Sequence, residues 1–442
     1  MRRLAGLERF TSLGTAHFSS CFSVVAMLEV DGPITLESLT RAAAALQREY
    51  EVLRVEVVEV PGGHFEFRPS ASPPRVEAVE GRGPEAWRAV WDELTRSSPE
   101  GLPWRLVWVR RPGTSVSQLL VSCHHCIFDI HSASLFFTGL LENLQAERDG
   151  KPRAREVVPL SAALPELVGA RWPVGGLLRL VWERYGRGVR GLPLEPAGAN
   201  GAPRQWNSLF RVLSPEATAR LVERCRAEQV TVGNALSAAL LAQVADRVRT
   251  QRGHHQANVA LTTTMDMRRH ADGDHSQCMG MLVGAMHTYY QSAAGDSVWA
   301  LARAVKAELA GAIARNEHRD FIRLYDLLGP GVARWLAGQN QGRPPESNLV
   351  VSNFGQLDDF GRGTFAARRF FITAAQSLFG ATLLLACGTL NGALQLHLGY
   401  AHPSVADATA HALLEAALAD LGLGAKLDAG RGRGQDSLSA TP

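Results

Sequence analysis

Cysteine is scarce in this sequence and widely spaced. Six cysteines are scattered through 442 residues, a pattern that suits reduced thiols in a cytosolic protein better than a disulfide framework. A chain of this length can bury a large core, so it needs neither disulfides nor a metal for stability. We therefore predict a cytoplasmic protein with two or three domains, or one large two-lobed unit.

An excess of charge and a long apolar run are also lacking. The net charge is +3 and no dense basic stripe is interleaved with aromatic residues, so charge gives no support to nucleic-acid binding. The basic start, Met1–Leu4, is followed by charged Glu8 rather than an apolar run, which argues against a signal peptide. The uncharged stretch Phe370–Leu390 is broken at Gly380 and Gly388, so it predicts two buried strands or one hairpin, and no membrane span.

Strand and helix patterns fall into two blocks. In the first, a largely buried strand (22–30) precedes a helix with Thr35 as its N-cap, and an alternating strand follows (53–59). A further strand (117–123) then leads through a histidine pair into a regular amphipathic helix (133–144).

The second block opens at Ser214, which is an N-cap followed by a first-turn proline. Between the blocks Pro, Gly and Arg accumulate, with one helical piece between Gly175 and Tyr185, which indicates a crossover. The elements predicted after Ser214 are helices over 217–229, 231–248, 299–316 and 405–421, strands over 259–267 and 348–352, and a hairpin over 382–388 and 392–400.

The histidine pair is the main candidate for chemistry. It lies in His124-His125-Cys126-Ile127-Phe128-Asp129, on the connection from a buried strand to a helix. Neutral imidazole, with a pKa near ~6.5, accepts a proton at cellular pH. Asp129 is expected to fix the loop, and a buried carboxylate needs a cation. Arg268 or Arg269, at the end of a predicted strand in the second block, is the expected partner.

This sequence resembles the condensation-domain and chloramphenicol acetyltransferase-like superfamily, and within it the stand-alone polyketide-associated and alcohol acyltransferases. The family motif His-His-x-x-x-Asp-Gly is matched except for its glycine. Three other stretches agree with the family in order and rough spacing, so that the resemblance covers about residues 10 to 422: Leu28–Pro33 with its helix and Tyr50–Arg54, Asp266–Arg268, and Ser352–Gly355.

The resemblance implies an α/β fold of two chloramphenicol acetyltransferase-like lobes. Each lobe would be a mixed sheet flanked by helices, and the two would meet at a tunnel. The implied divisions are an N-terminal lobe carrying the motif (1–150), a crossover linker (151–208), a C-terminal lobe (209–427) and a disordered tail (428–442).

The resemblance also implies an acyltransferase of secondary-metabolite or lipid biosynthesis. His125 would be the general base, with His124 supporting the loop and Asp129 paired with Arg268. Ser352, Asn353 and Gly355 would line the substrate channel, with Asn353 near the tetrahedral intermediate. The acyl donor would be acyl-CoA or a phosphopantetheinyl acyl carrier protein, and the acceptor a small-molecule hydroxyl, favoured over an amine. No bound metal or redox cofactor is implied, and we expect a monomer.

One position departs from the motif: Ile130 replaces the family glycine. Glycine would allow a positive φ, which a β-branched residue adopts only at a cost. A differently shaped loop or a narrowed acceptor pocket would follow, and Ile130 is therefore placed among the channel residues.

Several alternatives stay open at this point. The crowding of Cys123, His124, His125, Cys126 and His131 could indicate zinc, although no second ligand cluster is evident. Asp129 could take part in catalysis, Cys126 could be a nucleophile, and Asn353 could be only a turn residue. The protein could also be a free-standing condensation enzyme, a non-catalytic carrier-binding member, or a catalyst of cyclisation or elimination.

Overall fold

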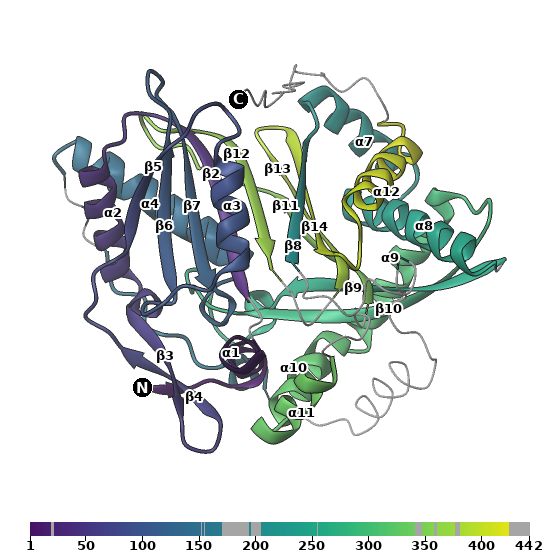
Figure 1. Ribbon diagram of the computed structural model, residues 1–442, viewed down its shortest axis with the longest axis horizontal. Coiled ribbons are helices and arrows are strands. Elements are labelled where there is room, and N and C mark those ends of the chain that lie inside the picture. The colour runs from purple at the N-terminus through teal and green to yellow at the C-terminus, as the bar shows by residue number, and fades with distance from the viewer. Residues whose placement is uncertain are drawn as a thin grey trace, which may run out of the picture.

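Two mixed β-sheets standing side by side form the frame of the molecule (Figure 1). The computed structural model describes residues 1–18, 22–151, 153, 155–169, 194–195, 205–253, 255–340, 347–357, 360–375 and 381–423. The helical piece predicted between residues 175 and 185, most of the predicted crossover, and the tail from 428 onward lie outside these residues. Within the described ranges, none of the helices combines the length and apolar character that crossing a bilayer requires.

The first sheet has five strands, and one of its inner strands, β2 (Ser23–Asp31), is buried on both faces. Alternate residues of this strand point to two separate clusters: Val24 packs with helices α2 and α4, whereas Val25 packs with α3. The strand order is β12-β2-β7-β6-β5, with β5 and β6 parallel and the other pairs antiparallel. The elements of this first lobe are α2 (Leu36–Glu49), β5 (Val76–Glu80), α3 (Trp87–Arg96), β6 (Trp104–Arg110), β7 (Val116–His124), α4 (Ile130–Arg148) and β12 (Ala366–Ala374).

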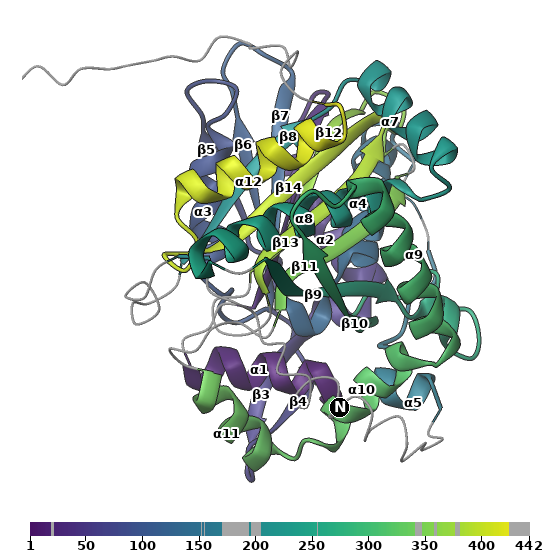
Figure 2. The ribbon, with the colours of Figure 1, turned by 90° about the vertical axis from the view of Figure 1, so that its right-hand side faces the viewer.

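The second sheet has six strands in the order β10-β9-β11-β13-β14-β8. Helices α8 and α12 run across one of its faces (Figure 2), where Leu349 and Val351 of β11 join their apolar cluster. Val350 between them belongs to the first lobe's core instead. The elements of this second lobe are β8 (Gln205–Val212), α7 (Pro215–Ala227), α8 (Val232–Arg252), β9 (Gln256–Asp266), β10 (Val283–Ala293), α9 (Val298–Ala314), β11 (Ser347–Gln356), β13 (Ala381–Leu390), β14 (Ala393–His402) and α12 (Asp407–Asp420).

A small third sheet and a group of helices close the lower end of the molecule in Figure 1. The sheet has the order β1-β4-β3. Helix α1 packs against α10, where the Phe10 and Tyr325 rings meet edge to face at 5.1 Å. The elements here are β1 (Arg2–Arg3), α1 (Gly6–Phe18), a 3₁₀ turn η1 (Glu51–Arg54), β3 (Val55–Val60), β4 (His64–Pro69), α5 (Leu164–Leu167), α10 (Glu317–Leu327) and α11 (Pro330–Asn340).

Strand β12 crosses from the second half of the chain into the first sheet. It pairs antiparallel with β2, so that Phe370 lies opposite Leu28. Residues 366–374 of the predicted C-terminal lobe (209–427) therefore join the sheet of the predicted N-terminal lobe. Strands β12 and β13 lie in different sheets, so the apolar stretch from Phe370 forms two buried strands and not one hairpin.

Candidate active site

The histidine pair lies where β7 leaves the first sheet. His124 is the last residue of β7 and faces Ser23 of β2. The next residues form a single 3₁₀ turn, η2 (His125–Ile127), and the His125 N–H donates to the Phe22 carbonyl at 2.8 Å. The turn is thus still anchored to the sheet by a backbone hydrogen bond.

The His125 ring is oriented by its own turn. Its Nδ1 lies 2.8 Å from the carbonyl oxygen of Phe128, which can only accept, so Nδ1 carries the proton. In this tautomer Nε2 presents a lone pair, and it has no hydrogen-bond partner in the described part of the chain. Burial lowers the pKa of His125, although the Phe128 carbonyl and Asp129 oppose the shift. A partly buried, neutral imidazole with a free Nε2 is a suitable proton acceptor.

His124 has the opposite arrangement, with both ring nitrogens used internally. Its Nδ1 accepts from the Cys126 N–H at 3.1 Å, so Nε2 carries the proton and donates to Thr15 Oγ1 at 3.0 Å. The Thr15 hydroxyl in turn donates to the Thr11 carbonyl. Burial, and secondly His125, lowers the pKa of His124 to about 3. His124 is therefore a neutral residue that fixes the turn against α1.

Cys126 is buried beside His124. Its Sγ lies 2.9 Å from His124 Nδ1, and burial raises the pKa of the thiol far above its ordinary range. A thiol that stays protonated is a poor nucleophile. The described residues hold no group of three or more His, Cys, Asp or Glu arranged to bind a metal ion.

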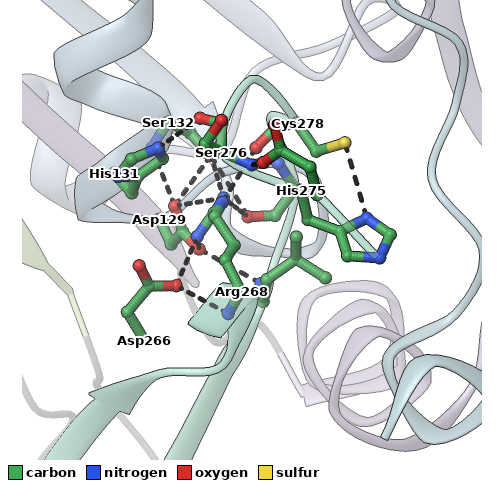
Figure 3. Close-up of polar contacts among 11 residues, drawn as sticks. Asp129, His131, Ser132, Asp266, Arg268, His275, Ser276 and Cys278 are labelled. Atoms are coloured by element: carbon green, nitrogen blue, oxygen red, sulfur yellow. Dashed lines mark hydrogen bonds and ion pairs between the residues drawn. The ribbon is translucent and has the colours of Figure 1, made fainter. Parts of the chain in front are cut away.

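Asp129 is both the N-cap of α4 and one half of a buried ion pair. Its Oδ1 accepts from the Ser132 N–H at 2.8 Å and from the Ser132 hydroxyl at 2.7 Å. Its Oδ2 accepts from the Leu282 N–H of the second lobe at 3.1 Å. The Arg268 guanidinium binds both carboxylate oxygens, at 2.8 and 3.1 Å (Figure 3).

Arg268 is held from three sides. Besides Asp129 it contacts Asp266 Oδ1 at 2.9 Å and the Cys278 carbonyl at 3.0 Å, whereas Arg269 is exposed. The side chains of Asp129 and Arg268 are each 3% exposed. Burial acts to raise the pKa of Asp129, but the Arg268 charge and the hydrogen bonds hold that pKa below its usual value. Groups of the second lobe bind both carboxylate oxygens of Asp129, so this carboxylate joins the two lobes. Of the two arginines predicted as its partner, Arg268 forms the ion pair and Arg269 does not.

Ile130 is the first residue of α4 and has ordinary helical geometry. The positive-φ residues of the described chain other than glycine are Gln229, Asn316 and Asn391, so position 130 does not require glycine. The Ile130 side chain packs against the first lobe's core. Both consequences predicted for this residue, a differently shaped loop and a narrowed acceptor pocket, stay predictions.

The predicted channel residues lie at the end of β11. Ser352 Oγ accepts from Thr264 Oγ1 of β9 at 2.9 Å. Asn353 Oδ1 accepts from the Gly355 N–H at 3.0 Å, and Gly355 has a φ of +68°. The amide nitrogen of Asn353 faces the start of α8, where a Cβ on Gly233 would lie only 2.3 Å away. These contacts are those of a turn residue, and a place for Asn353 beside the reacting atoms stays a prediction.

Phe354, which the sequence did not single out, joins the two lobes within the same turn. Its ring meets Phe370 of β12 at 5.9 Å, and Phe370 meets Phe137 of α4 at 6.2 Å. A Cβ on Gly388 of β13 would lie 1.9 Å from the Phe354 ring, so glycine there makes room for it. The sequence feature that could have pointed to Phe354 is its position as the aromatic residue inside the Ser-Asn-x-Gly stretch.

Comparison with known proteins agrees with this architecture. Residues 208–362 match the family model described as the phthiocerol/phthiodiolone dimycocerosyl transferase C-terminus. No curated protein matches the chain.

Solved structures match over almost the whole chain. The condensation domain of the Monacolin K polyketide synthase MokA has 14% identity and a TM-score of 0.71, with 96% of each chain covered. The trichothecene 15-O-acetyltransferase TRI3 from Fusarium sporotrichioides has 13% identity and a TM-score of 0.76, with 95% of each covered. Polyketide synthase associated protein 5 from Mycobacterium tuberculosis has 15% identity and a TM-score of 0.67, with 95% of this chain and 97% of that one covered. The chain therefore has the two-lobed α/β fold of condensation domains, as the resemblance implied.

Proposed function

We propose that the protein is an acyltransferase that moves an acyl group from a thioester to a hydroxyl or amine, with His125 as the general base. One observation carries the proposal: the Phe128 carbonyl binds Nδ1–H of His125 and leaves Nε2 as a lone pair on a neutral ring. The fold, and the family match over residues 208–362, are consistent with this chemistry.

In the proposed reaction, Nε2 of His125 takes the proton of the acceptor O–H or N–H. The acceptor atom then bonds to the thioester carbonyl carbon and forms a tetrahedral intermediate. When this intermediate collapses, the C–S bond breaks, and the departing sulfur receives the proton from His125. The products are an ester or amide and a free thiol, and His125 returns to its starting tautomer. A positioned base of this kind contributes ~10²–10⁴-fold in rate.

The remaining residues have supporting roles in this proposal. The ion pair of Asp129 and Arg268, with 2.8 Å between Oδ2 and Nη1, holds the two lobes together at the start of α4. We place donor and acceptor in a passage between the lobes, bordered by Ser352, Asn353 and Gly355. The donor is acyl-CoA or a phosphopantetheinyl acyl carrier protein, and the mechanism uses no bound metal or redox cofactor.

Ester formation is the preferred reaction. The TRI3 protein is, by its name, an O-acetyltransferase, and it shares the fold over 95% of both chains. The runner-up is a free-standing condensation enzyme that works on carrier-bound substrates, which the likeness to condensation domains favours. Mass spectrometry of products from carrier-loaded and CoA-loaded acyl groups separates the two functions.

The decisive variant is His125→Asn. An asparagine amide can still donate to the Phe128 carbonyl, but it offers no basic nitrogen. We expect kcat to fall ~10²–10⁴-fold while the melting temperature stays near that of the wild type. His411→Asn, at an exposed position on α12, is the matched control and should keep full activity. If His125→Asn retains wild-type turnover, the base is another group, and if the wild type transfers no acyl group from either donor, the chain is a binding protein.

A further inference from the structure

The loop between β9 and β10 (residues 267–282) reaches from the second lobe to the first turn of α4 and contacts it at two levels (Figure 3). At its base, Leu282 N–H donates to Asp129, and Gly280 N–H donates to Ser132 Oγ at 3.0 Å. Nearer the surface, His131 Nε2 lies 2.7 Å from the Ser276 carbonyl, to which it must donate.

The two levels differ in how firmly they are held. The base contacts are buried and include the Arg268 ion pair, whereas Ser276 is exposed. The other bonds at the tip are local: His275 Nε2 binds the Asp272 carbonyl, and Ser276 N–H binds Asp274. In the described residues, only two hydrogen bonds tie 272–278 to segments outside the loop.

The second of these bonds is weaker than the first. The Asp272 N–H lies 3.3 Å from the Leu167 carbonyl, against 2.7 Å for His131 and Ser276. His131 is therefore the principal connection between the loop tip and the first lobe (Figure 3). His131 lies outside the motif, six residues after His125 and immediately after Ile130.

We propose that His131 is a positioning residue, which holds the tip of loop 267–282 on α4 in the arrangement that binds substrate. This inference rests on the proposed acyl transfer. When the tip is released, the buried Asp129–Arg268 pair keeps the lobes joined, so the His125 turn and the chemical step are unaffected. The substrate-competent arrangement becomes less populated, which raises KM without lowering kcat.

The test compares His131→Ala with His131→Gln. Loss of one exposed hydrogen bond shifts the loop equilibrium roughly 2- to 10-fold. We expect His131→Ala to raise KM for one of the two substrates by at most that factor while kcat is kept. His131→Gln retains an N–H donor on a side chain of similar reach and should restore KM.

A second measurement needs no substrate. Hydrogen–deuterium exchange of the amides of residues 272–278 should speed up in His131→Ala by at most the same factor, with β9 and β10 unchanged. His411→Ala, which removes an exposed histidine from α12, should change neither exchange nor KM.

The outcomes are distinguishable. An unchanged KM in an active His131→Ala enzyme overturns the inference alone, whether or not exchange is faster, as does a His131→Gln variant that behaves like Ala. Absence of acyl transfer by the wild type overturns the proposed function and this inference together.

Discussion

Adjacent histidines, His124 and His125, belong to two different sides of one short turn. On the scaffold side, His124 and Asp129 are buried, and each polar atom has a protein partner. On the side of the proposed chemistry, His125 uses one nitrogen to fix its ring and leaves the other without a partner among the described residues. Within this turn, the groups with a partner for every polar atom hold the structure together, whereas the oriented nitrogen without a partner is the one to which the proposed chemistry is assigned. Variants on the scaffold side should lower stability, and the His125 variant should lower turnover.

The largest effect on the scaffold side is expected from Arg268→Met. Methionine fills much of the space but leaves the Asp129 carboxylate buried without its cation. Breaking a buried pair in this way costs about 3–5 kcal/mol, so the free energy of unfolding measured in urea should fall by that amount. Arg269→Met, at the exposed neighbour, is the control and should change it by less than about 0.5 kcal/mol. If the two substitutions lower the free energy of unfolding equally, the Asp129–Arg268 pair does not stabilise the fold.

The second-largest effect on the scaffold side is expected from acid, which should lower the free energy of unfolding through His124. The folded pKa of His124 is about 3, below the unfolded value of ~6.5. The unfolded state therefore binds more protons below pH ~6.5, and stability falls as pH drops from there toward 3. At about pH 5 this histidine alone costs roughly 2 kcal/mol relative to neutral pH.

Urea unfolding at neutral pH and at about pH 5 measures this loss. His124→Gln should show a shallower decline of stability with acid, by about one bound proton. His411→Gln, at an exposed site on α12, should decline like the wild type. An unchanged slope in His124→Gln would mean that the ring is not buried in its neutral form.

The local part of the fold could be predicted from the sequence. Thr35, Ser214 and Thr231 each accept from a backbone N–H three residues on, at the helix starts that the sequence indicated. Capping and hydrophobic periodicity depend on residues within one or two turns, so they can be predicted from the sequence alone. Among the elements that were not predicted are strands β6, β8 and β10 and helices α1, α3 and α10.

The exchange of β12 could not be predicted, because strand pairing depends on distant residues. Phe370 pairs opposite Leu28, 342 positions away, and apolar runs look alike whichever sheet they join. In the site, the histidine motif supplied His125 and Asp129, and the stretch Asp266–Arg268 supplied Arg268. Neither stretch indicated the contact of His131 with Ser276, which is tertiary.

The smallest expected effect comes from Thr15, which also was beyond prediction because α1 meets the turn 109 positions away in sequence. Thr15→Val keeps the shape of the side chain but leaves the buried Nε2–H of His124 without an acceptor. An unsatisfied buried donor costs about 1–3 kcal/mol, so unfolding in urea should shift accordingly, while kcat should change far less than in His125→Asn. Thr40→Val removes an equivalent hydroxyl, bonded to the Leu36 carbonyl on the exposed face of α2, and should leave both quantities unchanged. If Thr15→Val instead abolishes turnover without loss of stability, then His124 acts in the reaction, and the division of the turn into two sides is wrong.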